Sequence, residues 1–296
     1  MKKNANETRN AMTENLRIGI PSKGRLSELA TELLNQAGLQ FRRQERTLFA
    51  LVKHLPIDVI FLRTDDIPVL CSEGAIDLGI TGSDLVDESD ADVRVRMPLG
   101  VGHCRLSLCV PEDSPITSGQ QLDGKRVATS FPHVTRKYLA EQGAQAHLVE
   151  LSGSVEIMIS LGVADAIVDL VETGSTLAAN RLRVLADLGQ YQTVLIQNPR
   201  QSRDPELTER ILRRLEGVVI ARDYSLVEYN IPRDKLAEAE AITPGFNSPT
   251  ISALESSDWC SVRVMVKRKD VIAVMERLEA VGASAVLETA INNCRL

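Results

Sequence analysis

Aromatic residues are scarce in this chain, which has 296 residues and an aromatic content of 3%. Proteins that bind single-stranded nucleic acids need aromatic platforms on which the bases stack, so this scarcity argues against that class of ligand. An excess of basic residues is also absent, because the formal net charge is −6. We therefore expect neither nucleic acid nor a membrane surface as a partner, although a local basic pocket is compatible with this charge.

Cysteine and histidine are too few and too dispersed for a structural metal site or a disulfide framework. The five cysteines are odd in number, the chain has four histidines, and no CxxC pair occurs. This usage is typical of reduced cysteines in the cytosol. The N-terminus, MKKNANETRNAMTEN, lacks the apolar core of a signal peptide, and no apolar stretch reaches the length of a membrane span. We expect a cytoplasmic protein whose residues 1–15 form a flexible tail.

The length and a hydrophobic content of 44% are those of a globular protein with two or three domains. Apolar strands that alternate with helices predict an α/β fold, in which paired crossing strands join two lobes around a cleft. We assign residues 16–104 and 195–221 to lobe I and residues 105–194 to lobe II. The expected strands cover residues 16–20, 57–62, 76–80, 93–97, 105–110, 126–128, 147–151, 164–171 and 191–197.

The segment 222–296 has a different predicted order of strands and helices, βαββαβ, which is typical of a ferredoxin-like domain. We expect strands over residues 224–231, 249–254, 260–267 and 284–291, and helices over 233–242 and 269–281. Within the third of these strands, Val262, Val264 and Val266 share one face. No reactive group of residues stands out here, which favours a regulatory or oligomerising role over a catalytic one.

The stretch from Glu156 to Leu177 predicts a short helix, a buried strand over Ala164–Val171, and a loop that opens another helix. The loop consists of small or hydroxylated residues, namely Thr173, Gly174, Ser175 and Thr176. Backbone N–H groups at a helix N-terminus favour a phosphate through hydrogen bonds and through the helix dipole. The loop therefore predicts a phosphate site.

Two carboxylates accompany this loop, since Asp169 stands near the end of the strand and Glu156 one helix upstream. A carboxylate can accept two hydrogen bonds from a sugar diol, so the combination favours a phosphorylated sugar. Ligands of open parallel sheets bind beyond the carboxyl ends of the strands, where Asp169 is expected. The alternative is that the loop is only a helix cap and that both carboxylates are solvated.

Two further loops enter helices after strands. The first contains Lys23, Gly24 and Arg25, and the second contains Thr81, Gly82 and Asp84. Lys23 and Arg25 add positive charge for a nucleotide or phosphate, although neither GxGxxG nor GxxxxGK[ST] occurs. The alternative is a solvated helix start. His133 is expected in a loop over residues 129–133, where a lone histidine is usually not an acid or base.

Short motifs in a fixed order make the chain resemble one family, the long form of ATP phosphoribosyltransferase, the first enzyme of histidine biosynthesis. The run Asp169-Leu170-Val171-Glu172-Thr173-Gly174-Ser175-Thr176-Leu177 resembles the motif of this family for 5-phosphoribosyl 1-diphosphate (PRPP). Ser248-Pro249-Thr250 is similar to the C-terminal domain of the long form. The other matches are Lys23-Gly24-Arg25-Leu26, Leu55-Pro56-Ile57-Asp58, Asp77-Leu78-Gly79-Ile80-Thr81-Gly82, Gly102-His103-Cys104-Arg105-Leu106-Ser107, Gly124-Lys125-Arg126-Val127-Ala128-Thr129-Ser130 and Gly162-Val163-Ala164-Asp165-Ala166-Ile167.

The resemblance implies two periplasmic-binding-protein-like lobes and a ferredoxin-like regulatory domain. It implies a pentosyltransferase that condenses ATP, through adenine N1, with PRPP to give N1-(5-phospho-β-D-ribosyl)-ATP and diphosphate, with Mg²⁺ as cofactor. Glu156 and Asp169 would hold the ribose hydroxyls as the catalytic carboxylates, and residues 173–177 would hold the 5-phosphate. Candidates for the ATP and diphosphate side are Lys23, Gly24, Arg25, Thr81, Gly82 and Asp84.

The resemblance also implies partners. L-Histidine would be an allosteric inhibitor, AMP a competitive inhibitor, and the chain would form homo-oligomers between dimer and hexamer. No separate regulatory subunit is expected, because the C-terminal domain is present. We assign no protein ligand to Mg²⁺, which the diphosphate would carry. The alternative function is a two-lobed small-molecule binding protein without catalysis.

Overall fold

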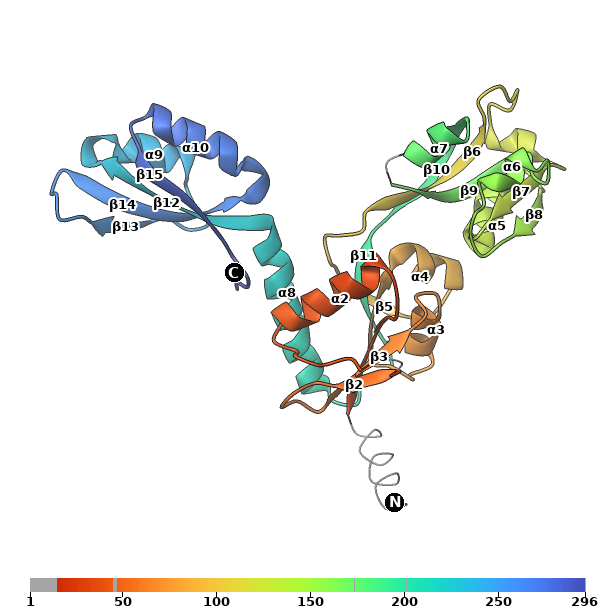
Figure 1. The fold of residues 1–296 in the computed structure, drawn as a ribbon, viewed down its shortest axis with the longest axis horizontal. Coiled ribbons are helices and arrows are strands. Elements are labelled where there is room, and N and C mark those ends of the chain that lie inside the picture. Colours follow the sequence, from red (N-terminus) through yellow and green to blue (C-terminus); the bar gives the residue numbers. More distant parts are fainter. Residues whose placement is uncertain (1–14, 45–46, 173, 201, 296) are drawn as a thin grey trace, which may run out of the picture. The chain divides into compact units, whose positions relative to one another are not determined.

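The computed structural model describes residues 15–44, 47–172, 174–200 and 202–295 (Figure 1). The expected tail, up to residue 14, lies outside the described residues. The chain divides into two compact units, the first of which ends at Thr31 and resumes over Gln40–Thr208. The second unit comprises Glu32–Leu39 and the chain from Glu209 onward, so the division passes through helix α8, Pro205–Asp223.

The first unit contains two sheets, and the sheet of lobe I has the order β2-β3-β1-β4-β11-β5. Its centre is parallel, since β1 pairs in parallel with β3 and with β4. These strands are nearly continuous runs of buried apolar residues, as expected where helices cover both faces of a parallel sheet. The strands are β1 Leu16–Pro21, β2 Phe49–Leu51, β3 Ile57–Leu62, β4 Leu78–Gly82, β5 Arg94–Pro98 and β11 Thr193–Gln197.

The sheet of lobe II has the order β10-β6-β9-β7-β8. Here β7 pairs in parallel with β8 and β9, whereas β6 runs antiparallel to β9 and to β10. The strands are β6 Cys104–Pro111, β7 Arg126–Thr129, β8 His147–Glu150, β9 Ala166–Val171 and β10 Leu182–Tyr191.

The two sheets share one plan, in which three parallel strands are followed by an antiparallel strand and then by a strand antiparallel to that one. The first sheet has β2 as an additional antiparallel edge strand. The chain leaves lobe I after β5 and enters lobe II as β6, and it returns from β10 to lobe I as β11. Each incoming strand, β6 or β11, pairs with the last parallel strand of its sheet. This pairing confirms the predicted α/β fold with two lobes and paired crossing segments (Figure 1).

Several boundaries differ from the sequence prediction. Strand β10 was not predicted, because its residues are mostly half-buried and two register shifts interrupt its pairing with β6. His133 was expected in a loop, and that expectation is wrong: helix α5 begins at Pro132 and places His133 in its first turn. Proline favours the first position of a helix, because its missing N–H is not needed there.

The remaining helices of the first unit are short. Helix α6 spans Ile157–Ser160, and Glu156 occupies the position before its first residue. Helix α7 spans Ser175–Ala179 and directly follows the expected phosphate loop. The others are α2 Arg25–Gln36, which ends in the second unit, α3 Asp66–Ser72, α4 Ser83–Ser89 and α5 Pro132–Glu141.

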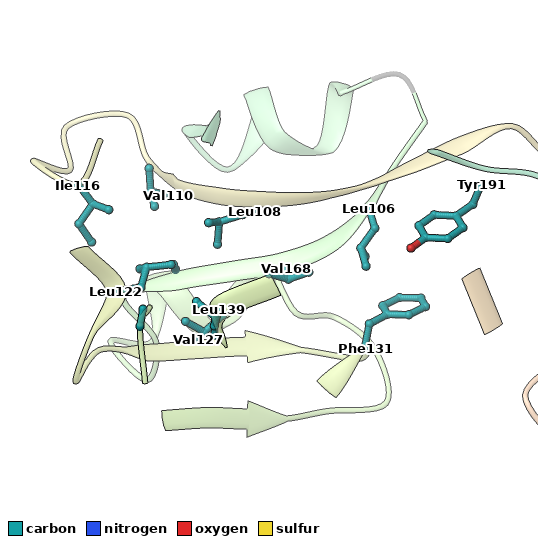
Figure 2. Packing of buried hydrophobic residues seen from close by; sticks show 12 residues of the cluster. Leu106, Leu108, Val110, Ile116, Leu122, Val127, Phe131, Leu139, Val168 and Tyr191 are labelled. Atoms are coloured by element: carbon teal, nitrogen blue, oxygen red, sulfur yellow. The ribbon is translucent and has the colours of Figure 1, made fainter. Parts of the chain in front are cut away.

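One of two buried apolar clusters of lobe II lies between its sheet and α5. Leu106, Leu108 and Val110 alternate along β6 and are fully buried, and Figure 2 shows them beside Val168 of β9. Phe131 and Tyr191 lie at the end of this cluster that is opposite Ile116 (Figure 2). Leu85 of α4, from lobe I, packs against the same cluster, so the two lobes share part of their apolar packing.

The second unit carries the C-terminal domain, whose four-stranded sheet has the order β13-β14-β12-β15. All its pairings are antiparallel, which confirms the predicted ferredoxin-like fold. Val262 and Val264 are buried as predicted, and Val266 packs at the margin of the same core. The elements are β12 Tyr224–Pro232, α9 Leu236–Ile242, β13 Thr250–Ala253, β14 Trp259–Lys267, α10 Val271–Ala280 and β15 Ser284–Ala290.

Among the described residues, no helix combines the length and the apolar character that crossing a membrane requires.

Candidate functional site

Asp169 lies near the carboxyl end of β9, opposite Ser107 of β6. One of its carboxylate oxygens accepts the backbone N–H of Leu170 at 2.8 Å. Burial raises the pKa of Asp169, the hydrogen bond from Leu170 opposes this shift, and the charge of Glu156 adds to it. The two carboxylates that the sequence singled out therefore lie near enough for their charges to interact.

The predicted phosphate loop leads into α7. Thr173 lies outside the described residues. Gly174 precedes the first residue of α7 and has φ 79°, a left-handed conformation that favours glycine. Ser175 and Thr176 are exposed in the first turn of α7. Leu177 is buried in the core that also contains Val171, so only its main chain is accessible to a ligand.

The Lys23-Gly24-Arg25 loop follows β1 and opens α2. All three residues are exposed, and Gly24 has φ 77°. The guanidinium of Arg25 donates to a carboxylate oxygen of Glu172 at 2.9 Å. Glu172 follows β9 and precedes the phosphate loop, so this ion pair joins the basic loop of lobe I to the phosphate loop of lobe II.

The third predicted group lies at the junction of β4 and α4. Thr81 is fully buried and its hydroxyl donates to the backbone oxygen of Thr64 at 3.3 Å, so that hydroxyl serves the fold. An added Cβ at Gly82 would lie 2.0 Å from a carboxylate oxygen of Asp84, so a larger residue there would displace the Asp84 side chain. Burial raises the pKa of Asp84, and the neighbouring charges of Asp65 and Asp87 add to the rise.

Cys104, the first residue of β6, lies where these groups approach one another. Burial raises the pKa of its thiol to about 11, with further contributions from the charges of Asp84 and Glu172. Asp84 belongs to lobe I and Glu172 to lobe II, so both carboxylates act on the start of a crossing strand. His133 is held at its backbone N–H by Glu88 at 2.8 Å, and no described contact gives its imidazole a role.

Sequence reasoning missed Arg43. Its guanidinium donates to the backbone oxygen of Ser22 at 2.8 Å and lies 4.1 Å from the centre of the Phe61 ring. Arg43 therefore adds positive charge beside the Lys23 loop and is held by a cation–π contact. The segment around Arg43 has no helical or strand periodicity. The only feature of the sequence that could have indicated this residue is the pair of adjacent arginines, Arg42 and Arg43.

The described residues contain no group of three or more His, Cys, Asp or Glu side chains arranged to hold a metal ion. The pair Glu156 and Asp169 supplies two carboxylates, too few to complete a coordination shell, so phosphates and water would have to supply most of the ligands of a metal ion here. The residues present therefore fit a metal ion that arrives with a phosphorylated ligand.

Comparison with known proteins identifies the family. The family model described as ATP phosphoribosyltransferase matches residues 63–217, and the model described as HisG, C-terminal domain, matches residues 221–293. A relative from Rhodopirellula baltica (strain DSM 10527 / NCIMB 13988 / SH1), named ATP phosphoribosyltransferase, is 70% identical over 95% of this chain and 94% of its own length. The chain belongs to the ATP phosphoribosyltransferase family. A second relative of that name, from Bifidobacterium longum (strain DJO10A), is 44% identical over 95% of this chain and its full length.

Membership in this family gives the enzyme its reaction, which joins ATP to PRPP in the biosynthesis of histidine, and the family generally uses metal ions. A non-catalytic binding protein is not supported, since the match to enzymes extends over almost the whole chain. Among solved structures, a chain of the ATP phosphoribosyl transferase (HisG:HisZ) complex from Thermotoga maritima is similar, with 31% identity and a TM-score of 0.62. The match covers 97% of that chain and 69% of this one.

Proposed function

We propose that PRPP binds at the carboxyl end of β9, with its 5-phosphate on the loop from Thr173 to Leu177. Gly174, Ser175 and Thr176 would present backbone N–H groups and hydroxyls to the phosphate. Asp169 and Glu156 would accept hydrogen bonds from the ribose hydroxyls. The observation that carries the proposal is the position of Asp169, whose half-buried carboxylate precedes a helix opened by a left-handed glycine.

Lobe I supplies the ATP and diphosphate side of this site. Lys23 and Arg25 carry the charge that a diphosphate needs, and Gly24 keeps their loop accessible. Gly82 and Asp84 shape the second wall, with Thr81 as its buried support. In this proposal, lobe I comprises residues 16–104 and 195–221 and binds ATP and the diphosphate. Lobe II comprises residues 105–194 and binds the phosphoribosyl part of PRPP.

The chemistry requires positioning more than acid–base catalysis. Adenine N1 has a free lone pair and attacks C1 of PRPP, while the bond from C1 to the diphosphate oxygen breaks and the electron pair leaves with diphosphate. Lys23 and Arg25 stabilise the leaving group, and Asp169 and Glu156 hold the ribose in line and stabilise the positive charge on the ring. Mg²⁺, carried by the diphosphate, would neutralise the charge that develops on the leaving oxygens.

The C-terminal domain, residues 222–296, has a regulatory role in this proposal. L-Histidine binds there between subunits and shifts a hexamer toward a form of low activity, and AMP competes with ATP. The Thermotoga maritima chain was solved in a HisG:HisZ complex. The match includes 97% of that chain but only 69% of this one, so this chain is the longer of the two. The match of residues 221–293 to the HisG C-terminal domain supports a regulator that is part of this chain, in place of a separate subunit. The enzyme of this proposal is cytoplasmic.

One assay tests the proposed roles. Purified protein is incubated with ATP, PRPP and Mg²⁺, and formation of phosphoribosyl-ATP is followed with and without L-histidine. We expect product that decreases with histidine and is lost in Asp169→Ala. Full turnover in Asp169→Ala would overturn the assignment of the carboxylate. Insensitivity to saturating histidine would leave the reaction intact and remove the regulatory role of the C-terminal domain.

A further inference from the structure

We infer that Glu172 is a positioning residue that exchanges with diphosphate: its carboxylate holds the guanidinium of Arg25 while the site is empty and releases it when PRPP binds. The inference rests on the proposed function, which assigns Arg25 to the diphosphate side.

The geometry of the pair supports an exchange. A nitrogen of Arg25 lies 2.9 Å from a carboxylate oxygen of Glu172, and the side chains are 71% and 53% exposed. Among the described residues, Glu172 is the one acidic side chain paired with Arg25. Arg25 is the first residue of α2, and its exposed side chain reaches across to the residue that follows β9 in lobe II.

A carboxylate and a diphosphate compete for the same donors. The planar guanidinium binds either oxyanion through its fork of N–H groups, and a diphosphate carries more negative charge than one carboxylate. Exposed ion pairs contribute little to stability, because solvent screens them. Glu172 therefore holds Arg25 firmly enough to orient it and weakly enough for diphosphate to displace the carboxylate.

The position of Glu172 makes the exchange useful for turnover. Glu172 lies between β9 and the phosphate loop, and its negative charge and that of Asp84 both act on Cys104 at the start of the crossing strand. A carboxylate that competes for Arg25 opposes retention of the diphosphate product. When diphosphate leaves, Glu172 takes back Arg25 and the two loops return to their initial arrangement.

The experiment measures binding of diphosphate with Mg²⁺ to the full-length protein by calorimetry, in a cycle of Glu172→Gln, Arg25→Ala and the double variant. We expect Glu172→Gln to bind diphosphate about two- to fivefold more tightly, the range set by the strength of an exposed ion pair. The gain should vanish in the Arg25→Ala background, since no guanidinium is then released. In turnover, Glu172→Gln should lower both the KM for PRPP and kcat, because diphosphate leaves more slowly.

The matched control is Glu150→Gln. Glu150 is also paired with an arginine, Arg136, and its side chain is likewise 53% exposed, but it lies on the edge strand β8 of lobe II. We expect this variant to bind diphosphate with unchanged affinity. A gain as large as that of Glu172→Gln would show a nonspecific effect of lost charge and would overturn the inference.

The other outcomes separate the inference from the proposed function. If the gain of Glu172→Gln persists without Arg25, the carboxylate acts by repulsion alone and the exchange is wrong. If Arg25→Ala weakens diphosphate binding while Glu172→Gln leaves it unchanged, the exchange fails and the proposed role of Arg25 stands. If Arg25→Ala binds diphosphate as the wild type does, Arg25 has no such role and both fail. Melting curves of all variants establish that the fold is intact.

Discussion

Glu88 accepts the backbone N–H of His133 at 2.8 Å and so caps a helix that belongs to the other lobe. Its second carboxylate oxygen accepts the N–H of Val134 at 3.0 Å. The residue at the cap position of α5 is Phe131, whose side chain makes no capping hydrogen bond. Because the first N–H groups of a helix have no partner within it, α5 depends on a carboxylate from α4. This contact fixes one face of lobe II against lobe I.

Removal of this carboxylate tests its importance. We expect Glu88→Ala to lower the free energy of unfolding by about 1–2 kcal/mol, as the loss of a helix cap does. The kcat/KM for PRPP should fall as well, because the phosphate loop is no longer held in register with lobe I. Denaturant titration and steady-state kinetics measure the two effects. Asp90→Asn, at the end of the same helix, removes an exposed carboxylate without a described capping bond and should change neither.

We expect Asp169 to lower the free energy of unfolding at pH values where its carboxylate is ionised, because its pKa is raised in the folded state. Burial raises the pKa of Asp169 in the folded state, so ionised Asp169 costs the fold free energy at neutral pH. The cost decreases as the pH falls through the folded pKa and disappears below the unfolded pKa, where both states are protonated.

We therefore expect Asp169→Asn to raise Tm by a few degrees near pH 7.5 and to lose this advantage near about pH 4. Its turnover should fall at least about 100-fold, since a charge that stabilises the transition state is gone. Calorimetric melts at both pH values, combined with the product assay, check both parts. A variant that is less stable than the wild type at neutral pH would contradict the electrostatic account.

The backbone of Gly174 offers a test of the phosphate loop. Gly174 has φ +79° and open space around an added Cβ, so Gly174→Ala strains the backbone without a clash. We expect a stability loss of about 1 kcal/mol and a raised KM for PRPP, because the first turn of α7 shifts. Gly143, which follows α5, has φ +71° and equally open surroundings. Gly143→Ala should lose similar stability with an unchanged KM, and a similar KM effect in both would argue against the loop.

The ion pair between Arg203 and Asp77 is expected to affect the stability of the protein but not its activity. Arg203 binds the carboxylate of Asp77 at 2.8 Å, and the Asp77 side chain is 3% exposed. Asp77 also accepts the backbone N–H groups of Arg17 and Arg203. We expect Arg203→Ala to lower the free energy of unfolding by about 3 kcal/mol, because a buried charge loses its partner.

The KM for PRPP and for ATP should not change in Arg203→Ala at temperatures where the variant is folded. The control is Arg200→Ala, which breaks an exposed pair with Asp92 whose closest atoms are 3.5 Å apart. Its effect on stability should be within about 0.5 kcal/mol. A large loss in this control would show that the whole segment, and not the buried carboxylate, determines stability.

Local patterns predicted the features that depend on local physics. The alternation of Val262 and Val264 predicted a half-buried strand, and both residues are buried. The strand that carries Asp169 was predicted from its run of apolar residues, and β9 is buried over Ala166–Val168. In both cases the periodicity of the side chains directly records which face meets the core.

Contacts between distant segments left no local signal. Glu88 and His133 are 45 residues apart, and Arg25 and Glu172 are 147 residues apart. Phe131 is a poor helix cap by its own chemistry, so the start of α5 could be understood only with Glu88 in place. Strand β10 was missed for a related reason, because its half-exposed residues pair with β6 through two irregularities. Irregular pairing removes the alternation on which a sequence prediction depends.

The position of β11 in the first sheet affects the order in which the lobes can be completed. β11 pairs with both β4 and β5, yet it follows every strand of lobe II in the chain. During synthesis, the strands of lobe II leave the ribosome as one uninterrupted stretch. The edges of β4 and β5 that pair with β11 stay unpaired until β11 has been synthesised. The lobe that is translated first is therefore the one whose sheet closes last.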